Sequence, residues 1–127
     1  MMTVKNLKTI FAIGLGAAIL SSIVTSNSFA ADGKKVFRKC KACHSFTKNK
    51  VGPNLKGIVG RTAGTAEGFK YSKAMKKAGE NGLVWSADEL DKFLTKPKKY
   101  MKKTKMSFSG LKKEDQRSAV IEYMASQ

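Results

Sequence analysis

The chain has 127 residues, of which 42% are hydrophobic, with 25 lysine or arginine residues against nine aspartate or glutamate residues. This length is that of one domain and excludes a large hydrophobic core. The formal net charge of +16 at pH 7 indicates anionic partners, which for a small basic protein are nucleic acid, acidic protein surfaces or anionic lipid.

Residues 1–30 have the layout of a secretory signal peptide. Two lysines form a short basic region, and an apolar run of 15 residues follows at 10–24. Ser28-Phe29-Ala30 then offers small residues at the two positions that a signal peptidase reads, so we expect cleavage after Ala30. The alternative is an uncleaved membrane anchor, but the run is shorter than the ~20 residues usually needed to span a bilayer. The leader holds two of the 25 basic residues and none of the nine acidic ones, so the mature domain, 31–127, carries +14.

The first helix is expected to start at Asp32, whose side chain can cap it, and to run to about Cys43. Its end carries Cys40-Lys41-Ala42-Cys43-His44, a C-x-x-C-H segment. This segment contains both cysteines and the only histidine of the chain. Every cysteine or histidine ligand that the chain can offer therefore lies in this one segment.

The C-x-x-C-H spacing is typical of covalent haem attachment. On one helical turn each cysteine can add to a vinyl group of a haem, and the histidine that follows falls under the iron as proximal ligand. A structural zinc site needs four Cys or His ligands, whereas the chain has only two Cys and one His. A thioredoxin-type redox pair is expected in a βαβ pattern, which the sequence lacks. We therefore expect one haem c, attached through Cys40 and Cys43 with His44 on the iron.

The rest of the chain predicts a small all-α domain of four to five helices around the haem. Five glycines between positions 52 and 68 indicate an irregular loop after the attachment segment. No segment shows a clear strand pattern. After the loop we expect a helix at 73–78, which Ser72 caps and Gly79 ends, and a second helix that begins with the capping box 86–89 and is limited by Pro97. A single helical turn is expected within 98–105, and a last helix at about 113–125.

The iron needs a second axial ligand, and no second histidine exists. A methionine thioether is the common alternative, and it raises the reduction potential. Three of the four methionines after the leader lie in predicted helices or a turn, where methionine is usually packing: Met75, Met101 and Met124. Met106 lies in an extended segment that can lay its side chain against the haem. Position alone therefore favours Met106 and leaves Met101 as the alternative.

Seven segments of residues 31–127 match those of one family in order and at near-identical spacing. They are Gly33-Lys-Lys-Val-Phe37, Gly52-Pro53-Asn54-Leu55, Gly60-Arg61, Trp85, Pro97-Lys98-Lys99-Tyr100, Thr104-Lys105-Met106, and Gly110 with Lys112-Lys113. On these segments the chain resembles a class I cytochrome c, close to the mitochondrial and bacterial electron-carrier type. The resemblance covers almost all of the mature domain and implies Met106, rather than Met101, as the second iron ligand.

The resemblance also implies roles for other residues around the haem. The Pro53 carbonyl would accept the ring N–H of His44 and orient the imidazole. Arg61, Tyr71 and Trp85 match positions that hydrogen-bond a haem propionate, where an arginine offsets the desolvation of the carboxylate. The apolar side chains implied to line the haem are Leu55, Leu94 and Phe108.

The chain departs from the mitochondrial pattern at three places near the haem. Phe93 replaces a tyrosine that donates to the methionine sulfur, and Met75 replaces an asparagine of the haem's polar network. Lys102-Lys103 replaces a Pro-Gly pair, which adds two cations to the methionine loop and removes a stiff proline. The resemblance further implies that Gly33 and Tyr123 lie where the first and last helices cross, because a residue without a side chain lets the backbones approach closely.

The function that the resemblance implies is that of a soluble, monomeric periplasmic electron carrier, which turns over no substrate. It would shuttle electrons between a cytochrome bc complex and a terminal cytochrome oxidase or photosynthetic reaction centre. Lysines on both sides of the haem would face acidic surfaces of these partners, with anionic lipid as a further contact, whereas export leaves little access to nucleic acid. The alternatives are a haem peroxidase or gas-binding cytochrome with five-coordinate, high-spin iron, and a membrane-tethered carrier that retains residues 1–30.

Overall fold

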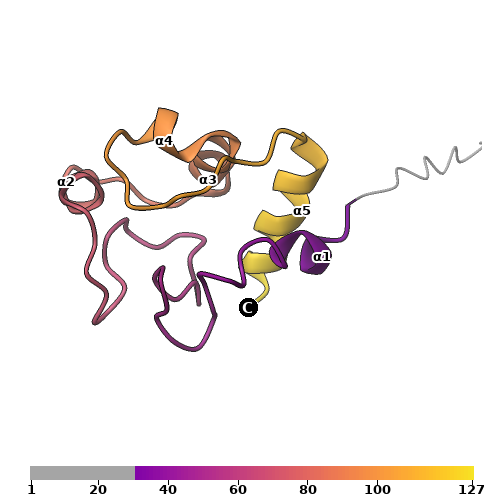
Figure 1. Ribbon diagram of the computed structural model, residues 1–127, viewed down its shortest axis with the longest axis horizontal. Coiled ribbons are helices and arrows are strands. Elements are labelled where there is room, and N and C mark those ends of the chain that lie inside the picture. The colour runs from indigo at the N-terminus through magenta and orange to yellow at the C-terminus, as the bar shows by residue number, and fades with distance from the viewer. Residues whose placement is uncertain (1–30) are drawn as a thin grey trace, which may run out of the picture.

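The computed structural model describes residues 31–127, which form five α-helices, most of them joined by irregular segments (Figure 1). The helices are α1 (Gly33–Phe37), α2 (Lys73–Glu80), α3 (Ala87–Thr95), α4 (Pro97–Tyr100) and α5 (Glu114–Ala125). Within this range the β pairing is limited to one isolated bridge between Thr62 and Val84. The expected all-α class is therefore confirmed. The predicted leader, 1–30, lies outside the described residues, and no helix in the described part is long and apolar enough to cross a membrane.

The first helix is shorter than the sequence predicts. Asp32 caps it as expected, with its carboxylate accepting the Lys35 N–H at 3.2 Å. The α-helix ends at Phe37 rather than near Cys43, because the following N–H groups bond three residues back. Cys40 donates to Phe37 O at 2.9 Å, and Cys43 donates to Cys40 O at 3.1 Å. The two cysteines therefore lie on consecutive tight turns rather than on a continuous α-helix.

The second helix is longer than predicted, because Gly79 does not end it. Ser72 caps α2 by accepting the Met75 N–H at 3.1 Å, as expected. Gly79 lies inside the helix, and a Cβ at this position would lie 1.9 Å from Ala63 O. The glycine therefore lets a distant loop pass against α2, while Gly82, with φ +90°, supplies the left-handed residue that follows the helix.

The capping box before α3 forms in part. Ser86 accepts the Glu89 N–H at 3.1 Å, which satisfies one of the free donors at the helix start. The Glu89 carboxylate does not return to Ser86; it accepts from Lys92 at 2.7 Å and from the Tyr100 hydroxyl. This pairing ties α3 to α4. Pro97 limits α3 as expected, but it is also the first residue of α4, which was predicted to lie within 98–105.

The hydrophobic core lies where α1 and α3 pack on α5. Gly33 permits the α1–α5 crossing, because a Cβ there would lie 2.1 Å from Ala119 O and 2.8 Å from the Tyr123 Cβ. The Phe37 ring stacks on Phe46, with ring centroids 4.6 Å apart, and tilts against Tyr123 at 5.5 Å. The buried core side chains are Val36, Phe37, Ile58, Ala63, Trp85, Leu90, Phe93, Leu94, Met101, Leu111, Val120, Ile121 and Met124.

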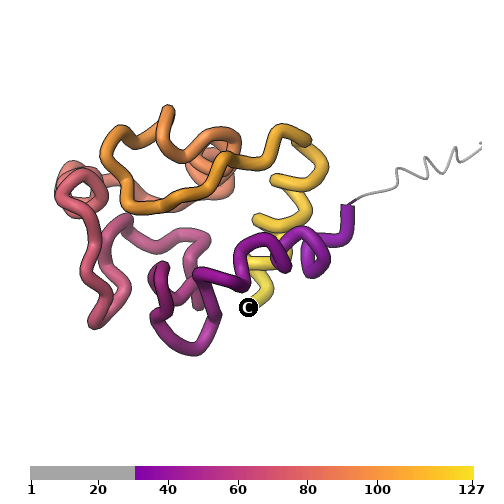
Figure 2. Tube along the Cα trace, viewed as in Figure 1, coloured from indigo at the N-terminus to yellow at the C-terminus, as the bar shows by residue number. Residues whose placement is uncertain are grey.

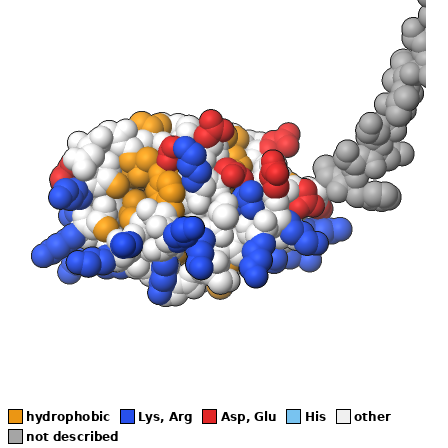
Figure 3. All heavy atoms as spheres, turned by 90° about the horizontal axis from the view of Figure 1, so that it is seen from above, with side chains coloured by type: hydrophobic (Ala, Val, Ile, Leu, Met, Phe, Trp, Pro, Cys, Tyr) orange, Lys and Arg blue, Asp and Glu red, His pale blue; other side chains and the backbone are white. Residues whose placement is uncertain are grey.

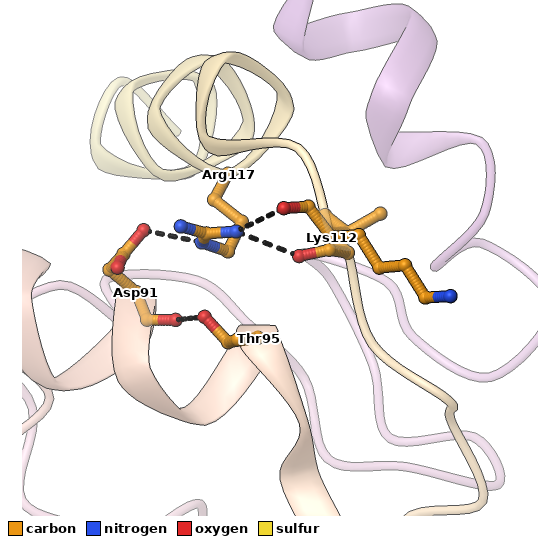
Figure 4. A network of polar contacts seen from close by, with 5 residues as sticks. Asp91, Thr95, Lys112 and Arg117 are labelled. Atoms are coloured by element: carbon orange, nitrogen blue, oxygen red, sulfur yellow. Dashed lines mark hydrogen bonds and ion pairs between the residues drawn. The ribbon is translucent and has the colours of Figure 1, made fainter.

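A buried arginine joins α5 to α3 and to the segment before α5 (Figure 4). The Arg117 Nε donates to Asp91 Oδ1 at 2.6 Å, and one terminal nitrogen donates to Leu111 O at 2.9 Å and Lys112 O at 3.0 Å. The last two acceptors follow the Met106 segment closely in sequence. Arg117 therefore fixes where the chain that carries Met106 returns to the core.

Candidate functional site

A cavity with two lobes, of about 230 and 90 Å³, lies between the turns after α1, helix α2 and the segment before α5. Figure 2 shows how these three stretches, far apart in sequence, surround the centre of the molecule. Five residues line both lobes, so the lobes belong to one cavity: Cys40, His44, Tyr71, Met75 and Met106. The attachment segment and two thioethers thus face the same space.

All the site residues predicted from the sequence line this cavity. Cys43 and Phe108 line the larger lobe. The smaller lobe is lined by Pro53, Leu55, Arg61, Trp85 and Leu94. Apolar side chains that the sequence did not nominate complete the walls, among them Phe69 in the larger lobe and Leu90 in the smaller. No local motif marks Phe69, whereas Leu90 follows the capping box 86–89 on the apolar stripe of its helix and was predicted only to be buried. The packing of distant segments decides that both residues line the cavity.

The His44 ring is held in one orientation. Its Nδ1 lies 2.8 Å from Pro53 O, and because a carbonyl can only accept, Nδ1 carries the proton and Nε2 keeps a free lone pair. Burial lowers the pKa of His44, although the hydrogen bond to Pro53 acts in the opposite direction. The ring is therefore poised as a neutral imidazole, which is the form that binds a metal.

Both cysteines are free thiols beside His44. Cys40 is half-buried and Cys43 is exposed, and both line the larger lobe. Burial raises the pKa of the Cys40 thiol to about 11. Two sulfurs on consecutive turns, next to a metal-binding imidazole, match the donor set for a haem held by two thioether bonds.

Arg61 shows that the smaller lobe suits a carboxylate. Its two terminal nitrogens donate to Asn54 O at 2.9 Å and Lys56 O at 3.1 Å. Its Nε is buried and has no hydrogen-bond partner within residues 31–127, and a buried donor without a partner is costly. Tyr71 accepts the Ala66 N–H at 3.0 Å, which leaves its own hydroxyl proton available. A haem propionate would satisfy both donors, so the residues fit the group.

The tertiary structure shows which of the four methionines line the cavity. Met101 is 7% exposed within the core and lines neither lobe, and Met124 is 4% exposed and lines only the smaller lobe. Met106 lines both lobes, and so does Met75. The interpretation of Met75 as plain helix packing is therefore incomplete. Its place where the family has an asparagine of the haem's polar network was the signal that it faces the cavity.

Substituting Gly52 with alanine should displace the His44 ring. A Cβ at this position would lie 2.4 Å from the His44 Cε1, so the ring must move and its bond to Pro53 weakens. We expect the free energy of unfolding of the ferric holo-protein to fall by about 1–3 kcal/mol, as for other overpacked sites. Guanidinium unfolding followed at the haem absorption checks this.

Gly57→Asn is the matched control, because nothing lies within 4 Å of that Cβ position and φ is +63°. Asparagine tolerates this left-handed backbone. Equal losses of unfolding free energy in Gly52→Ala and Gly57→Asn would show that the close contact with Gly52 does not hold the His44 ring in place.

The comparisons with known proteins agree with the geometry of the cavity. The family model described as cytochrome c matches residues 30–127. Cytochrome c2 of Afifella marina is 53% identical over 97 residues, 74% of this chain and 78% of the relative. Cytochrome c2 of Rhodopseudomonas palustris (strain ATCC BAA-98 / CGA009) is 42% identical over an alignment of 137 residues, which covers 97% of this chain and 98% of the relative.

Solved structures show the same likeness. Cytochrome cH from Methylobacterium extorquens superposes with a TM-score of 0.72 at 44% identity, over 77% of this chain and 98% of that one. Ferricytochrome c2 from Rhodopseudomonas palustris gives a TM-score of 0.70 at 42% identity, over 76% and 98%. The chain therefore belongs to the cytochrome c family, as a class I member that carries one covalently attached haem c and acts as an electron carrier rather than as an enzyme.

Proposed function

We propose that this protein is a periplasmic one-electron carrier whose iron is held between His44 and Met106. The observation that carries the proposal is that these two side chains, from distant segments, line both lobes of the cavity that also holds Cys40. When bound, the haem supplies one-electron chemistry by alternating between ferric and ferrous iron. Filling both axial positions from the protein would leave no open site for oxygen or peroxide, which is why we favour a carrier with six-coordinate iron.

The other cavity residues would bury and orient the prosthetic group. Cys40 and Cys43 would hold it covalently, and Arg61 with Tyr71 and Trp85 would receive a propionate. Leu55, Leu94 and Phe108 supply apolar wall, and a hydrophobic shell controls solvent access and therefore the reduction potential. Pro53 would keep the His44 imidazole in the tautomer that binds iron through Nε2.

The charge distribution favours acidic redox proteins as partners. Lys39 and Lys105 line the larger lobe, and exposed lysines at 41, 98, 99, 102 and 103 lie close to them in sequence. Six of the nine acidic residues lie in α3 and α5. Figure 3 shows lysine and arginine crowded along one edge of the molecule, with most of the acidic side chains in view away from that edge. A cytochrome bc complex, a cytochrome oxidase or a photosynthetic reaction centre that offers an acidic docking surface would fit.

The ligation should be visible in the methionine methyl signals of the ferrous holo-protein. The ring current of the haem shifts the methyl group of an axial methionine far from the others, so methyl-labelled protein should show one displaced signal. Met106→Leu should remove this native signal, whereas Met101→Leu and Met75→Leu should retain it. Loss of the signal in the Met101 variant would assign the axial position to Met101 instead.

Export should be visible in the mass of the mature protein. A periplasmic extract should contain a species that begins at Ala31 and is heavier by one haem, which acidified organic solvent does not extract, because the two thioether bonds are covalent. A species that retains residues 1–30 would instead support the membrane-tethered carrier.

A further inference from the structure

We propose that Met75 is a reserve thioether ligand, which takes the axial position on the iron when Met106 leaves it. The inference rests on the axial role of Met106 proposed above. Met75 and Met106 are the two methionines that line both lobes of the cavity. The cavity therefore offers two sulfur ligands of the same chemical type, carried by different elements of the fold.

The backbone of Met75 is held in place by its neighbours. Its N–H donates at 3.1 Å to the side chain of Ser72, which is 8% exposed. The chain at Gly64 passes so close to α2 that a Cβ there would lie 3.1 Å from Met75 O. From this fixed point, an unbranched side chain with three rotatable bonds can redirect its sulfur within the cavity. Met75 can therefore change rotamer without any change in α2.

The segment that carries Met106 is held less firmly. It lies in no helix, and the Met106 N–H bonds to the Thr104 hydroxyl at 3.3 Å, a long distance for such a bond. Lys103 has φ +65°, a left-handed conformation that is unfavourable for lysine, because its Cβ crowds the carbonyl oxygen that follows and its side chain cannot compensate as that of asparagine can. Lys102, Lys103 and Lys105 also place like charges together. Opening of this segment should therefore require less free energy than unfolding of α2.

Other groups compete poorly for the vacated position at neutral pH. Met101 is packed in the core outside the cavity, and Met124 is 4% exposed among its core neighbours. Lys105 lines the larger lobe, but its ammonium donates to Lys70 O at 3.0 Å and must lose a proton before it can bind a metal. The exchange to Met75 breaks one sulfur–iron bond and forms another, with no change of oxidation state or protonation.

The test compares three variants of the ferric holo-protein by the near-infrared band that reports sulfur on low-spin iron. Met106→Ala should retain the band at a shifted position, because Met75 binds. Met106→Ala/Met75→Leu should lose it, giving high-spin or lysine-bound iron. Met106→Ala/Met124→Leu is the matched control and should keep the band. Carbon monoxide should bind ferrous Met106→Ala at least tenfold more slowly than it binds the Met75 double variant.

A Met106→Ala protein without the band, and with the carbon monoxide rate of the double variant, would overturn the reserve role while leaving Met106 as the native ligand. Loss of the native band in Met75→Leu alone would instead contradict the axial role of Met106, and the reserve role with it. Met106→Leu replaces the alanine variant if the latter does not fold, since leucine conserves the volume. The same near-infrared band and the same carbon monoxide rate then decide the question.

Discussion

Replacing Arg117 with leucine should lower the free energy of unfolding of the holo-protein by about 3 kcal/mol, the low end for breaking a buried charge pair. The substitution removes the guanidinium that donates to Leu111 O and Lys112 O, and it removes the ion-pair partner of Asp91. The Arg117 side chain is 10% exposed, whereas Asp91 is 38% exposed, so water relieves part of the loss on the aspartate side. Guanidinium unfolding at neutral pH measures the effect.

The matched control for Arg117 is the second ion pair of the described residues, Lys92–Glu89. Its lysine side chain is 61% exposed, and surface pairs of this kind contribute about 0–1 kcal/mol. Lys92→Gln should therefore change the unfolding free energy much less than Arg117→Leu does. Equal losses from the two variants would mean that burial does not set the strength of the Arg117 network.

The rate of electron transfer to an acidic redox partner should fall steeply as the ionic strength rises. Electrostatic steering of this kind raises association rates by roughly 10- to 1,000-fold at low salt. At physiological ionic strength the screening length is about 8 Å, so the advantage is then largely lost. Stopped-flow measurement of the bimolecular rate across an ionic-strength series gives the slope directly.

Charge reversal identifies the docking face. Lys39→Glu or Lys99→Glu should flatten the ionic-strength slope, because Lys39 lines the larger lobe and Lys99 is exposed and lies close to the Met106 segment in sequence. Lys76→Glu and Lys77→Glu on the exposed side of α2 change the net charge equally and serve as controls. Equal effects from all four variants would show that net charge, rather than docking at the cavity mouth, sets the rate.

The sequence by itself determined the haem chemistry and the starts of three helices, because both depend on neighbours in the chain. Covalent attachment requires two cysteines and a histidine within a few residues of one another, which Cys40 to His44 supply. Asp32, Ser72 and Ser86 each cap the helix that follows through a bond three residues along. Such hydrogen bonds form between residues a few positions apart, so the local pattern of residue types is enough to predict them.

Resemblance to the family identified an iron ligand that position in the chain alone left open. Position alone left Met101 open as the second iron ligand, and the family's spacing selected Met106. The structure agrees with that choice in one respect, since Met101 is buried in the core and Met106 lines the cavity. The same resemblance placed Met75 at a position of the haem's polar network, and the structure shows that Met75 lines both lobes of the cavity.

Only the tertiary structure decided the features that depend on close approach of distant segments. Gly79 looked like a helix end, yet it lies inside α2 because Ala63 O passes against it. Asp91 and Arg117 pair across 26 positions, and Met75 faces the same cavity as Met106 from another element. These contacts form when the chain packs around a common centre, and no local pattern of residue types encodes which distant backbone atom will arrive beside a given side chain.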